Sequence, residues 1–278
     1  MKIAIQGEFG SFSHEAAIKL VADAAIVPFS LSADAFAALA NGTVEAAVIP
    51  IENSLAGSVS EHFDLLLTHN VLVERETLLR IKHNLIAISG AATSEIDRVF
   101  SHPVALAQCR RFLANHPRME AFAFYDTAGS VKQLVELRDR HAAAIASEAA
   151  AYHYGAQILE SGIEDNPENF TRFFLVRRAA DTVVDPRSKK ISLAFSVENR
   201  PGSLVAALSQ LSALGTNLTK IESRPVHGKP WEYIFYVDCQ IHSSEEGSRA
   251  LQALASHCSM VKELGRYREA LLPARARS

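Results

Sequence analysis

The sequence predicts an α/β protein made of two successive parts. Up to residue 178, short apolar runs alternate with helical stretches, an order typical of a mainly parallel sheet covered by helices. A polar stretch over residues 179–190 interrupts this alternation, and residues 191–267 then follow the different order βαββαβ. These observations indicate two folded regions joined by a linker, and the length of 278 residues suits two domains.

The first part opens with an apolar strand over residues 2–6, and Ser13 is a suitable N-cap for the helix that follows over residues 14–22. A second helix begins at Ser32 or Asp34 and ends before residues 41–42, an Asn-Gly pair. Further apolar runs are expected to be strands, at residues 44–51, 85–88, 98–100, 121–125, 143–146 and 173–177. The helices expected between them cover residues 59–68, 105–115, 127–138 and 148–154.

The second part contains four strands and two helices in about 80 residues. Strands are expected at residues 191–197, 218–222, 233–241 and 261–267, and helices at residues 203–214 and 244–255. This is the ferredoxin-like order βαββαβ. Residues 179–190 are polar and charged and lack an apolar stripe, so they are predicted to form a linker.

Composition excludes several classes of protein. The chain has 28 Lys and Arg against 31 Asp and Glu, which argues against a nucleic-acid partner, because such partners usually require a basic excess. Its three cysteines lack CxxC spacing and support neither a disulfide framework nor a zinc site, so no metal is expected. The N-terminus turns polar within seven residues, and no apolar run approaches the roughly 20 residues that span a bilayer. We therefore expect a cytoplasmic protein without a membrane partner.

Polar clusters follow three predicted strands, at residues 7–13, 50–54 and 101–109, and a fourth cluster, at residues 169–173, leads into the strand expected at residues 173–177. Ligands of open α/β sheets bind at the carboxyl ends of strands, and the backbone N–H groups of a helix start suit an anion. Thr171 and Arg172 offer a hydroxyl donor and a planar cation, a pair that suits a carboxylate substrate. No general base lies beside Thr171 in sequence, so a Ser/His/Asp type of catalysis lacks local support. Taken alone, each cluster is also compatible with an ordinary turn.

A second site is predicted in the C-terminal part, where residues 199–204 open a helix. A helix N-terminus can hold a carboxylate, and Asn217 or Glu222 could meet an ammonium group, which together would form an amino-acid site. The alternative is a plain helix cap followed by a turn.

Together these motifs resemble prephenate dehydratase with a C-terminal ACT domain. They occur in order over nearly the whole chain, at residues 7–13, 50–54, 101–103, 108–109, 126–128, 169–173, 199–205 and 222–225. Val104 stands where the family usually has Gln after His-Pro, and Ser203 stands where it usually has Ala. The resemblance does not include a chorismate mutase segment, so no bifunctional enzyme of that kind is expected.

The resemblance implies that residues 1–178 form a two-lobed catalytic domain similar to type 2 periplasmic binding proteins. Lobe 1 would comprise residues 1–77 and 158–178, lobe 2 residues 78–157, and the ACT domain residues 191–278. The implied reaction converts prephenate to phenylpyruvate, water and carbon dioxide in L-phenylalanine biosynthesis, with no cofactor. Three alternatives remain: arogenate dehydratase, a non-catalytic small-molecule binding protein, and an inactive regulatory ACT protein.

The resemblance also implies roles for individual residues. Thr171 would donate a hydrogen bond to the leaving hydroxyl within a network formed by Asn53, Ser101 and Gln108. Arg172 would bind the pyruvyl carboxylate, because a grip on the ring carboxylate would oppose decarboxylation. Glu52 would position its neighbours. The implied substrate-binding residues are Ser11, Phe12, Ser13, Ser54, Thr127 and Phe173.

The ACT resemblance implies that L-phenylalanine is an allosteric inhibitor. Its carboxylate would meet the helix start at Gly202, Ser203 and Leu204. The residues expected to complete the site from across a subunit interface are Asn217, Leu218, Glu222, Ser223 and Arg224. Residues 191–267 would therefore mediate a homodimer or a homotetramer.

Overall fold

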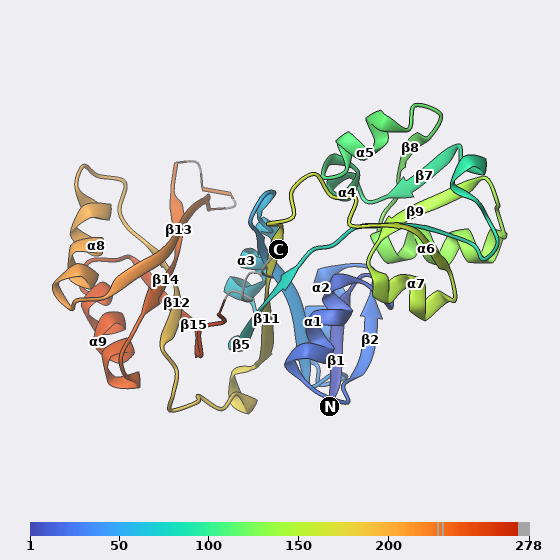
Figure 1. The fold of residues 1–278 in the computed structure, drawn as a ribbon. Helices are drawn as coiled ribbons and strands as arrows, with labels where there is room; N and C mark the ends of the chain where they lie inside the picture. The colour runs from blue at the N-terminus through green and yellow to red at the C-terminus, as the bar shows by residue number, and fades with distance from the viewer. Residues whose placement is uncertain (227, 230, 272–278) are drawn as a thin grey trace. The chain divides into compact units, whose positions relative to one another are not determined.

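The protein has an α/β fold with mixed sheets in the computed structural model, which describes residues 1–226, 228–229 and 231–271 (Figure 1). The chain divides into two compact units. Unit 1 comprises residues 1–59 and 77–173, and unit 2 comprises residues 60–76 and 174–271. The end of the predicted ACT domain, residues 272–278, lies outside the described residues. The predicted α/β class is confirmed.

The first sheet has the strand order β2-β1-β3-β11-β5, with β4 paired to β3. Strand β1 lies between β2 and β3 and pairs in parallel with both. Three successive residues of β1, Ile3, Ala4 and Ile5, are fully buried, as expected for a parallel strand covered on both faces. The strands are β1 (Lys2–Gln6), β2 (Ala25–Phe29), β3 (Ala46–Asn53), β4 (Gly57–Ser58), β5 (Val71–Arg80) and β11 (Phe170–Arg178).

Two helices connect the first three strands, α1 (Phe12–Leu20) and α2 (Ser32–Ala40). The predicted N-cap of the first helix was wrong by two residues: Ser11 is the cap, and its Oγ accepts a hydrogen bond from the backbone N of His14. Strands β2 and β5 were not indicated by the sequence pattern. β2 contains Pro28, which occurs in sheets mainly on edge strands such as this one.

The second sheet belongs to unit 1 and has the strand order β10-β6-β9-β7-β8. β7 is parallel to β8 and β9, whereas β6 is antiparallel to β9 and β10, so the predicted mainly parallel pairing holds only in part. Side chains of β9 alternate between two apolar cores, with Ala143 and Ile145 on one face and Ala144 and Ala146 on the other. The strands are β6 (Asn84–Ala87), β7 (Arg98–Ser101), β8 (Glu120–Ala123), β9 (Ala142–Ala146) and β10 (Gln157–Ser161).

The helical segments attached to this sheet are η1 (Thr93–Glu95), α4 (Pro103–Ala107), α5 (Arg110–Asn115), α6 (Thr127–Leu137) and α7 (Glu148–Tyr154). The single helix expected over residues 105–115 was wrong. It is broken between Gln108, the C-cap of α4, and Cys109, the N-cap of α5. The break releases the Gln108 side chain from a regular helical surface, and this matters for the site described below.

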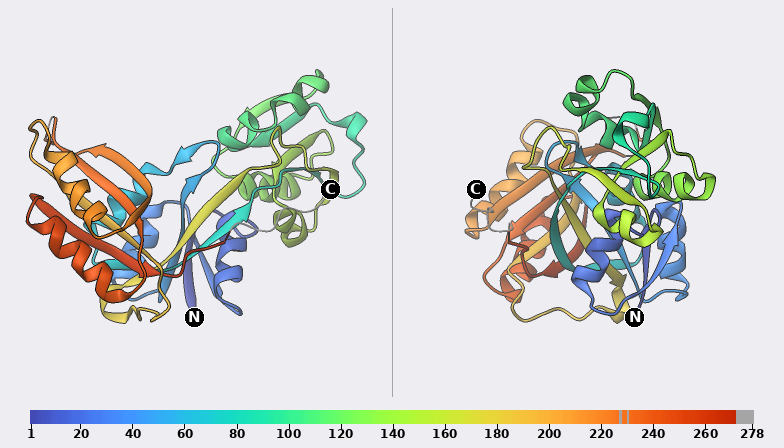
Figure 2. Two further views of the ribbon diagram at one scale, coloured as in Figure 1. Left: turned by 60° about the vertical axis from the view of Figure 1, so that its left-hand side comes forward. Right: turned by 45° about the vertical axis from the view of Figure 1, so that its right-hand side comes forward.

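Unit 2 contains a four-stranded antiparallel sheet with the order β13-β14-β12-β15. Helices α8 and α9 lie on one face of it, as Figure 1 and the left view of Figure 2 show, and enclose an apolar core there. The order of elements is the βαββαβ expected from the sequence. The elements are η2 (Ala179–Asp181), β12 (Lys190–Ser196), α8 (Ser203–Ala213), β13 (Asn217–Pro225), β14 (Tyr233–Gln240), α9 (Ser244–Ala255) and β15 (Met260–Tyr267).

The opposite face of this sheet is covered by the earlier segment of unit 2. Phe63 of α3 (Ser60–Thr68) packs on Tyr236, with ring centroids 4.8 Å apart. Lys262 of β15 donates from Nζ to the backbone oxygens of Leu66, Leu67 and His69, at 2.7–2.9 Å. Because Nζ meets the carbonyls that end α3, it satisfies acceptors that the helix itself leaves unpaired.

Charged groups lie buried on the same face. Lys190 of β12 places Nζ 3.2 Å from Oε1 of Glu76 in β5 and 3.6 Å from Oε1 of Glu269. Ser192 donates from Oγ to Oδ1 of Asp238 at 2.5 Å and is also hydrogen-bonded to the hydroxyl of Tyr267. The contact of Lys190 with Glu76 connects the segment of residues 60–76 to a strand more than a hundred positions later in the chain. No helix among the described residues is long and apolar enough to cross a membrane.

Candidate active site

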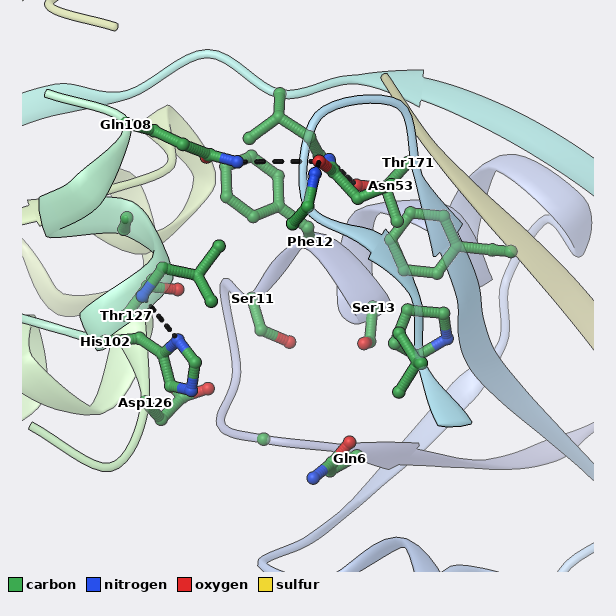
Figure 3. A pocket seen from close by; sticks show the side chains of 18 of the residues that line it. Gln6, Ser11, Phe12, Ser13, Asn53, His102, Gln108, Asp126, Thr127 and Thr171 are labelled. Carbon is green, nitrogen blue, oxygen red and sulfur yellow. Dashed lines mark hydrogen bonds between the residues drawn. The ribbon is translucent and has the colours of Figure 1, made fainter. Parts of the chain in front are cut away.

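Unit 1 contains a pocket of about 450 Å³ at the carboxyl ends of strands from both of its sheets (Figure 3). Ligands of open α/β sheets bind at such strand ends. Eight of the residues predicted for catalysis or substrate binding line it: Ser11, Phe12, Ser13, Asn53, Gln108, Thr127, Thr171 and Phe173. The other four, Glu52, Ser54, Ser101 and Arg172, are not among the lining residues.

Asn53, at the end of β3, has a carboxamide whose orientation is set by the backbone. Its Oδ1 accepts hydrogen bonds from the backbone N of Leu55 at 3.0 Å and of Ala56 at 2.8 Å. A backbone N–H can only donate, so the atom facing it must be the oxygen of Asn53. The Nδ2 group therefore points the other way, 2.9 Å from Oγ1 of Thr171 and 2.7 Å from Oδ1 of Asn169.

The orientation of Asn53 determines that of the next two amides. Since Oδ1 of Asn169 accepts from Asn53, its Nδ2 is the donor to Oε1 of Gln108, at 2.9 Å. The same Gln108 oxygen lies 2.9 Å from Nε2 of His83, so that ring nitrogen carries the hydrogen. The remaining end of the amide, Nε2 of Gln108, points back to Oδ1 of Asn53 at 3.5 Å. Figure 3 shows the contacts from Gln108 through Asn53 to Thr171.

Thr171 lies at the end of this chain of amides and is largely buried. Its Oγ1 accepts from Asn53, so its own hydroxyl hydrogen is available to another acceptor, and none is found among the described residues. The hydroxyl reaches the pocket (Figure 3). Thr171 can therefore donate a hydrogen bond to a bound molecule while the amide of Asn53 polarises its oxygen.

Arg172 lies next to Thr171 in β11, and neighbouring side chains of a strand point to opposite faces of the sheet. Thr171 and Phe173 line the pocket, whereas the buried guanidinium of Arg172 lies with Nη1 3.9 Å from Oε2 of Glu52. The carboxylate-binding role expected for Arg172 and the positioning role expected for Glu52 stay predictions.

Ser101 and Ser54 make backbone contacts. Ser101 is fully buried, and its Oγ donates to the carbonyl oxygen of Ile145 at 2.6 Å. Ser54 accepts on Oγ from the backbone N of Phe170 at 3.0 Å and connects the loop after β3 to the start of β11. Both side chains therefore hold the frame around the pocket in this structure, and the direct roles expected for them stay predictions.

The described lining residues include no Lys or Arg, so an anion bound in the pocket must be held by neutral donors. Two helices of at least nine residues begin there. Ser11 caps α1, and the side chain of Ser13 in the first turn points into the pocket (Figure 3). Asp126 caps α6 through Gly129, and Thr127 is the first residue of that helix. Helix N-termini present N–H groups and a positive dipole end to an anion.

Asp126 is the carboxyl group of the lining. Burial raises its pKa, hydrogen bonds from backbone N–H groups oppose this rise, and the nearby charge of Glu8 adds to it. Within residues 1–226, 228–229 and 231–271, no three His, Cys, Asp or Glu side chains gather in a group that could hold a metal ion.

His83 and Asn169 are two site residues to which the sequence analysis gave no role. His83 precedes β6, in a segment without a recognised motif. Asn169 was part of the motif at residues 169–173, but its position before the apolar run gave no hint that it joins two other amides. The signal that could have found them is a polar side chain next to a predicted buried strand, since a buried polar group needs a hydrogen-bond partner.

The residues predicted to bind phenylalanine lie in unit 2. Gly202 is the N-cap of α8, with φ of 85°, whereas Asn217 begins β13 after the other end of that helix. The side chain of Asn217 donates to Oε1 of Gln240 at 2.9 Å, and Leu218 packs against the apolar core. Glu222 pairs with Lys220 at 3.1 Å, and Arg224 pairs with Asp64 of α3 at 2.9 Å. One chain therefore does not bring Gly202 and Asn217 together.

Residues 3–181 match the family model of prephenate dehydratase. The chain belongs to this family. A plant member, the chloroplastic arogenate dehydratase/prephenate dehydratase 2 of Arabidopsis thaliana, is 38% identical over 277 residues, which cover 96% of this chain and 72% of that protein. The prephenate dehydratase family thus accounts for the order of motifs seen in the sequence.

Two solved structures are similar to this chain over nearly its whole length. A prephenate dehydratase from Arthrobacter aurescens, in complex with L-Phe, has a TM-score of 0.88 and 31% identity, covering 97% of this chain and 90% of that one. GqqA, described as a novel type of quorum quenching acylase, has the same TM-score and identity and covers 96% and 98% of the two chains.

Proposed function

We propose that this protein converts prephenate to phenylpyruvate, water and carbon dioxide. The observation that carries the proposal is the hydroxyl of Thr171, which the amide of Asn53 orients so that its hydrogen is free for a ligand of the pocket. Membership of the prephenate dehydratase family supports the same reaction.

The reaction breaks two bonds of the prephenate ring. The bond to the ring carboxylate breaks, its electron pair enters the ring, and carbon dioxide leaves. The bond to the ring hydroxyl breaks at the other end, and the departing hydroxide takes up a proton to become water. Thr171 donates a hydrogen bond to that oxygen, and this bond strengthens as negative charge develops. Thr171 is too weak an acid to release its proton unaided, so the hydrogen bond lowers the barrier while a solvent proton completes the water molecule.

Prephenate carries two carboxylates, and the pocket supplies different surroundings for them. The N–H groups at the start of α1 and α6, with the hydroxyls of Ser13 and Thr127, suit the pyruvyl carboxylate. A cation beside the ring carboxylate would stabilise the charge that must be lost, so neutral surroundings favour decarboxylation. The alternative remains that Arg172 holds the pyruvyl carboxylate, as the family resemblance implies.

The two possibilities for Arg172 can be separated by kinetics. If Arg172 binds the carboxylate, Arg172→Leu raises KM strongly, and Lys at this position rescues only in part, because a point charge cannot reproduce a bidentate guanidinium. If helix N-termini bind it, Arg172→Leu lowers the Tm and changes KM little, whereas Ser13→Ala and Thr127→Ala raise KM.

Arogenate dehydratase is the first alternative, because the Arabidopsis relative is named for both activities. Purified protein should be given prephenate and arogenate separately, with phenylpyruvate and phenylalanine measured as the respective products. Turnover of prephenate alone supports the proposal. Turnover of arogenate alone would contradict the proposal and identify an arogenate dehydratase. Binding of either compound without turnover would indicate a non-catalytic binding protein.

Acylase activity is a second alternative, because of the similarity to GqqA. An acylase of the Ser–His type needs a histidine that activates a hydroxyl. Two histidines line the pocket: His83 contacts Gln108, and Nδ1 of His102 accepts from the backbone N of Val104 at 3.3 Å. Neither is hydrogen-bonded to a Ser or Thr hydroxyl within the described part of the chain. An N-acyl amide belongs in the assay as a control and should not be hydrolysed.

We further infer that residues 191–271 form an ACT-type regulatory domain and that L-phenylalanine inhibits the enzyme through it. The order βαββαβ, the antiparallel sheet and the L-Phe complex of the Arthrobacter relative support this. We propose the domain division with catalytic residues 1–178, linker 179–190 and regulatory residues from 191 onward. A homodimer or homotetramer would let the start of α8 in one subunit meet β13 of another. We also propose a cytoplasmic location.

The chain offers a matched pair of variants for the inhibition. Gly202 and Gly215 flank α8, both have positive φ, and a Cβ at either would meet nothing within 4 Å. Gly202→Val and Gly215→Val should therefore cost similar backbone strain. Only Gly202→Val should abolish inhibition in a phenylalanine titration of prephenate turnover, because it blocks the proposed carboxylate position. Equal loss in both variants, or inhibition that competes with prephenate, would contradict the regulatory site. Sedimentation tests the oligomer, and a monomer at micromolar concentration would refute it.

A further inference from the structure

We propose that His83 and Asn169 are positioning residues that fix the direction of the hydrogen bonds reaching Thr171. The inference rests on the proposed dehydratase function. Neither residue touches the reacting hydroxyl. Instead each holds an amide that lies between it and Thr171, so that the hydroxyl hydrogen of Thr171 stays directed at the substrate.

Asn169 selects which hydrogen of Asn53 reaches Thr171. The Nδ2 group of Asn53 has two hydrogens, and Oδ1 of Asn169 accepts one of them at 2.7 Å. The second has two acceptors, Oγ1 of Thr171 at 2.9 Å and the more distant backbone oxygen of Phe170 at 3.3 Å. Asn169 is fully buried, so water cannot substitute for it. Without Oδ1 of Asn169, the amide of Asn53 loses one of the hydrogen bonds that hold its plane in place.

The backbone at Leu55 and Ala56 sets the polarity of the whole chain of amides. A rotated Asn169 would place its Nδ2 against Nδ2 of Asn53, two donors face to face, and Asn53 itself cannot rotate without losing two backbone bonds. Asn169 must therefore donate to Gln108, and Gln108 must present an oxygen to His83. Each hydrogen bond in this chain therefore has one allowed direction. The chain begins at two backbone N–H groups and ends at the imidazole of His83.

His83 completes the chain because it donates from Nε2 and accepts nothing through Nδ1. The Nδ1 atom is buried and has no hydrogen-bond partner in the described part of the chain. Burial lowers the pKa of His83, which favours the neutral ring, while its contact with Gln108 and the charge of Glu164 oppose this. The ring is also held by an edge-to-face contact with Phe12, and its backbone N donates to Oε2 of Glu164 at 2.9 Å.

The geometry distinguishes positioning from general acid–base catalysis by His83. A catalytic imidazole needs a nitrogen within hydrogen-bond reach of the proton that it transfers. Nε2 of His83 is occupied by Gln108, and Nδ1 is buried away from solvent. His83 therefore acts on the reaction through Gln108, and its effect depends on where its donor lies rather than on its ability to titrate.

Two substitutions of His83 separate these roles. The amide nitrogen of Gln reaches about as far as Nε2 of His, whereas that of Asn reaches only to the position of Nδ1. His83→Gln should therefore retain most of kcat, while His83→Asn and His83→Met should lower kcat about tenfold, the effect of one lost hydrogen bond, with little change in KM. Equal losses in Gln, Asn and Met would mean that the ring only fills space, and the proposal would fail.

Asn169→Asp and Asn169→Leu test the other residue at nearly constant volume. The carboxylate of Asp can accept from Asn53 but cannot donate to Gln108, and Leu can do neither. In both variants the fold decrease in kcat should exceed the fold increase in KM. Circular dichroism should show that each variant is folded. Normal kcat in both would overturn the role of Asn169.

A measurement without turnover keeps this inference separate from the proposed function. Nitrogen-15 NMR of the full chain can assign the protonated nitrogen of His83, identified among 11 histidines by the signal missing from His83→Gln. The expected state above neutral pH is the neutral ring with the hydrogen on Nε2. A hydrogen on Nδ1 would refute the direction of the chain even if prephenate is turned over. If the tautomer is as expected and prephenate is inert, the proposed function fails and the positioning network stands.

Discussion

The two units contain buried polar networks of opposite character. In unit 1, Thr171 is reached through three neutral amides whose orientations follow from backbone donors. In unit 2, Lys190 is buried between two carboxylates, and Ser192 joins Asp238 to Tyr267. Amides give a direction to a hydrogen bond without adding charge. Ions hold separate segments together, but only while each partner is present, because a buried charge without its partner is costly.

This difference predicts that the two networks fail in different measurements. Damage to the amides should lower kcat and lower the free energy of unfolding by less than damage to the ion pairs does. Damage to the ion pairs should lower the free energy of unfolding and leave kcat nearly unchanged at low temperature.

Lys190→Met should produce the largest effect, because it removes a buried cation 3.2 Å from Oε1 of Glu76, whose side chain is 2% exposed. Loss of one partner of a buried pair costs about 3–5 kcal/mol of stability. Urea unfolding measures it. The double variant Lys190→Met/Glu76→Leu should recover most of the loss, and the backbone N of Ala270, which donates to Glu76, limits that recovery. A single variant as stable as wild type would show that this pair does not hold unit 2 together.

Thr171→Ala should lower kcat by about 10²–10³-fold, the usual effect of removing one donor that acts on developing charge. KM should change less, because the bond is strongest in the transition state. Thr171→Ser is the matched control and should stay active, since it keeps the hydroxyl. Near-normal turnover by Thr171→Ala would remove the hydroxyl from the mechanism. If Thr171→Ala also lowered the free energy of unfolding as much as Lys190→Met does, the two networks would not differ in the way described.

Gly265→Ala should destabilise unit 2 by about 1–3 kcal/mol, the usual cost of overpacking, and by more if the strands cannot separate. A Cβ at this position of β15 would lie 2.2 Å from the backbone oxygen of Val73, and the residue has φ of 152°. Differential scanning calorimetry should show a lower Tm with kcat unchanged at low temperature. Gly155→Ala is a control with positive φ and open space around it. Equal decreases in Tm for Gly265→Ala and Gly155→Ala would mean that backbone strain, not the contact with Val73, causes the loss.

Glu15→Gln should give the smallest effect, and its sign depends on pH. Burial raises the pKa of Glu15 in α1, and the charge of Glu148 adds to this, while a hydrogen bond with Ser147 opposes it. A carboxyl whose pKa is raised by folding favours the folded state at low pH and loses that contribution as pH rises through the raised pKa. The substitution should therefore raise the Tm slightly at pH 7 and not at pH 4. The reverse pattern would contradict the assigned shift.

The sequence was sufficient for those features that depend on local pattern. The order of elements in residues 190–267 follows from alternating apolar residues and clear helix boundaries, and β9 is recognisable as an uninterrupted apolar run. The opposite faces of Thr171 and Arg172 could also have been predicted, because adjacent side chains of a strand alternate between the two faces of its sheet.

Other features depend on contacts between distant segments. The break after Gln108 puts its amide beside Asn169, which is 61 positions away, and no local propensity indicates this. The packing of α3 against the later sheet depends on Phe63, Lys262 and Tyr236 meeting in space. Strand β10 is short, polar and at a sheet edge, so tertiary pairing rather than pattern forms it.

The attachment of α3 by Lys262 has a mechanical consequence. The three carbonyl oxygens meet at one nitrogen, so the end of α3 loses three hydrogen bonds together if Lys262 is displaced. A shift of β15 must either break these three hydrogen bonds or carry α3 with it, so the strand and the helix are expected to move as one body within unit 2.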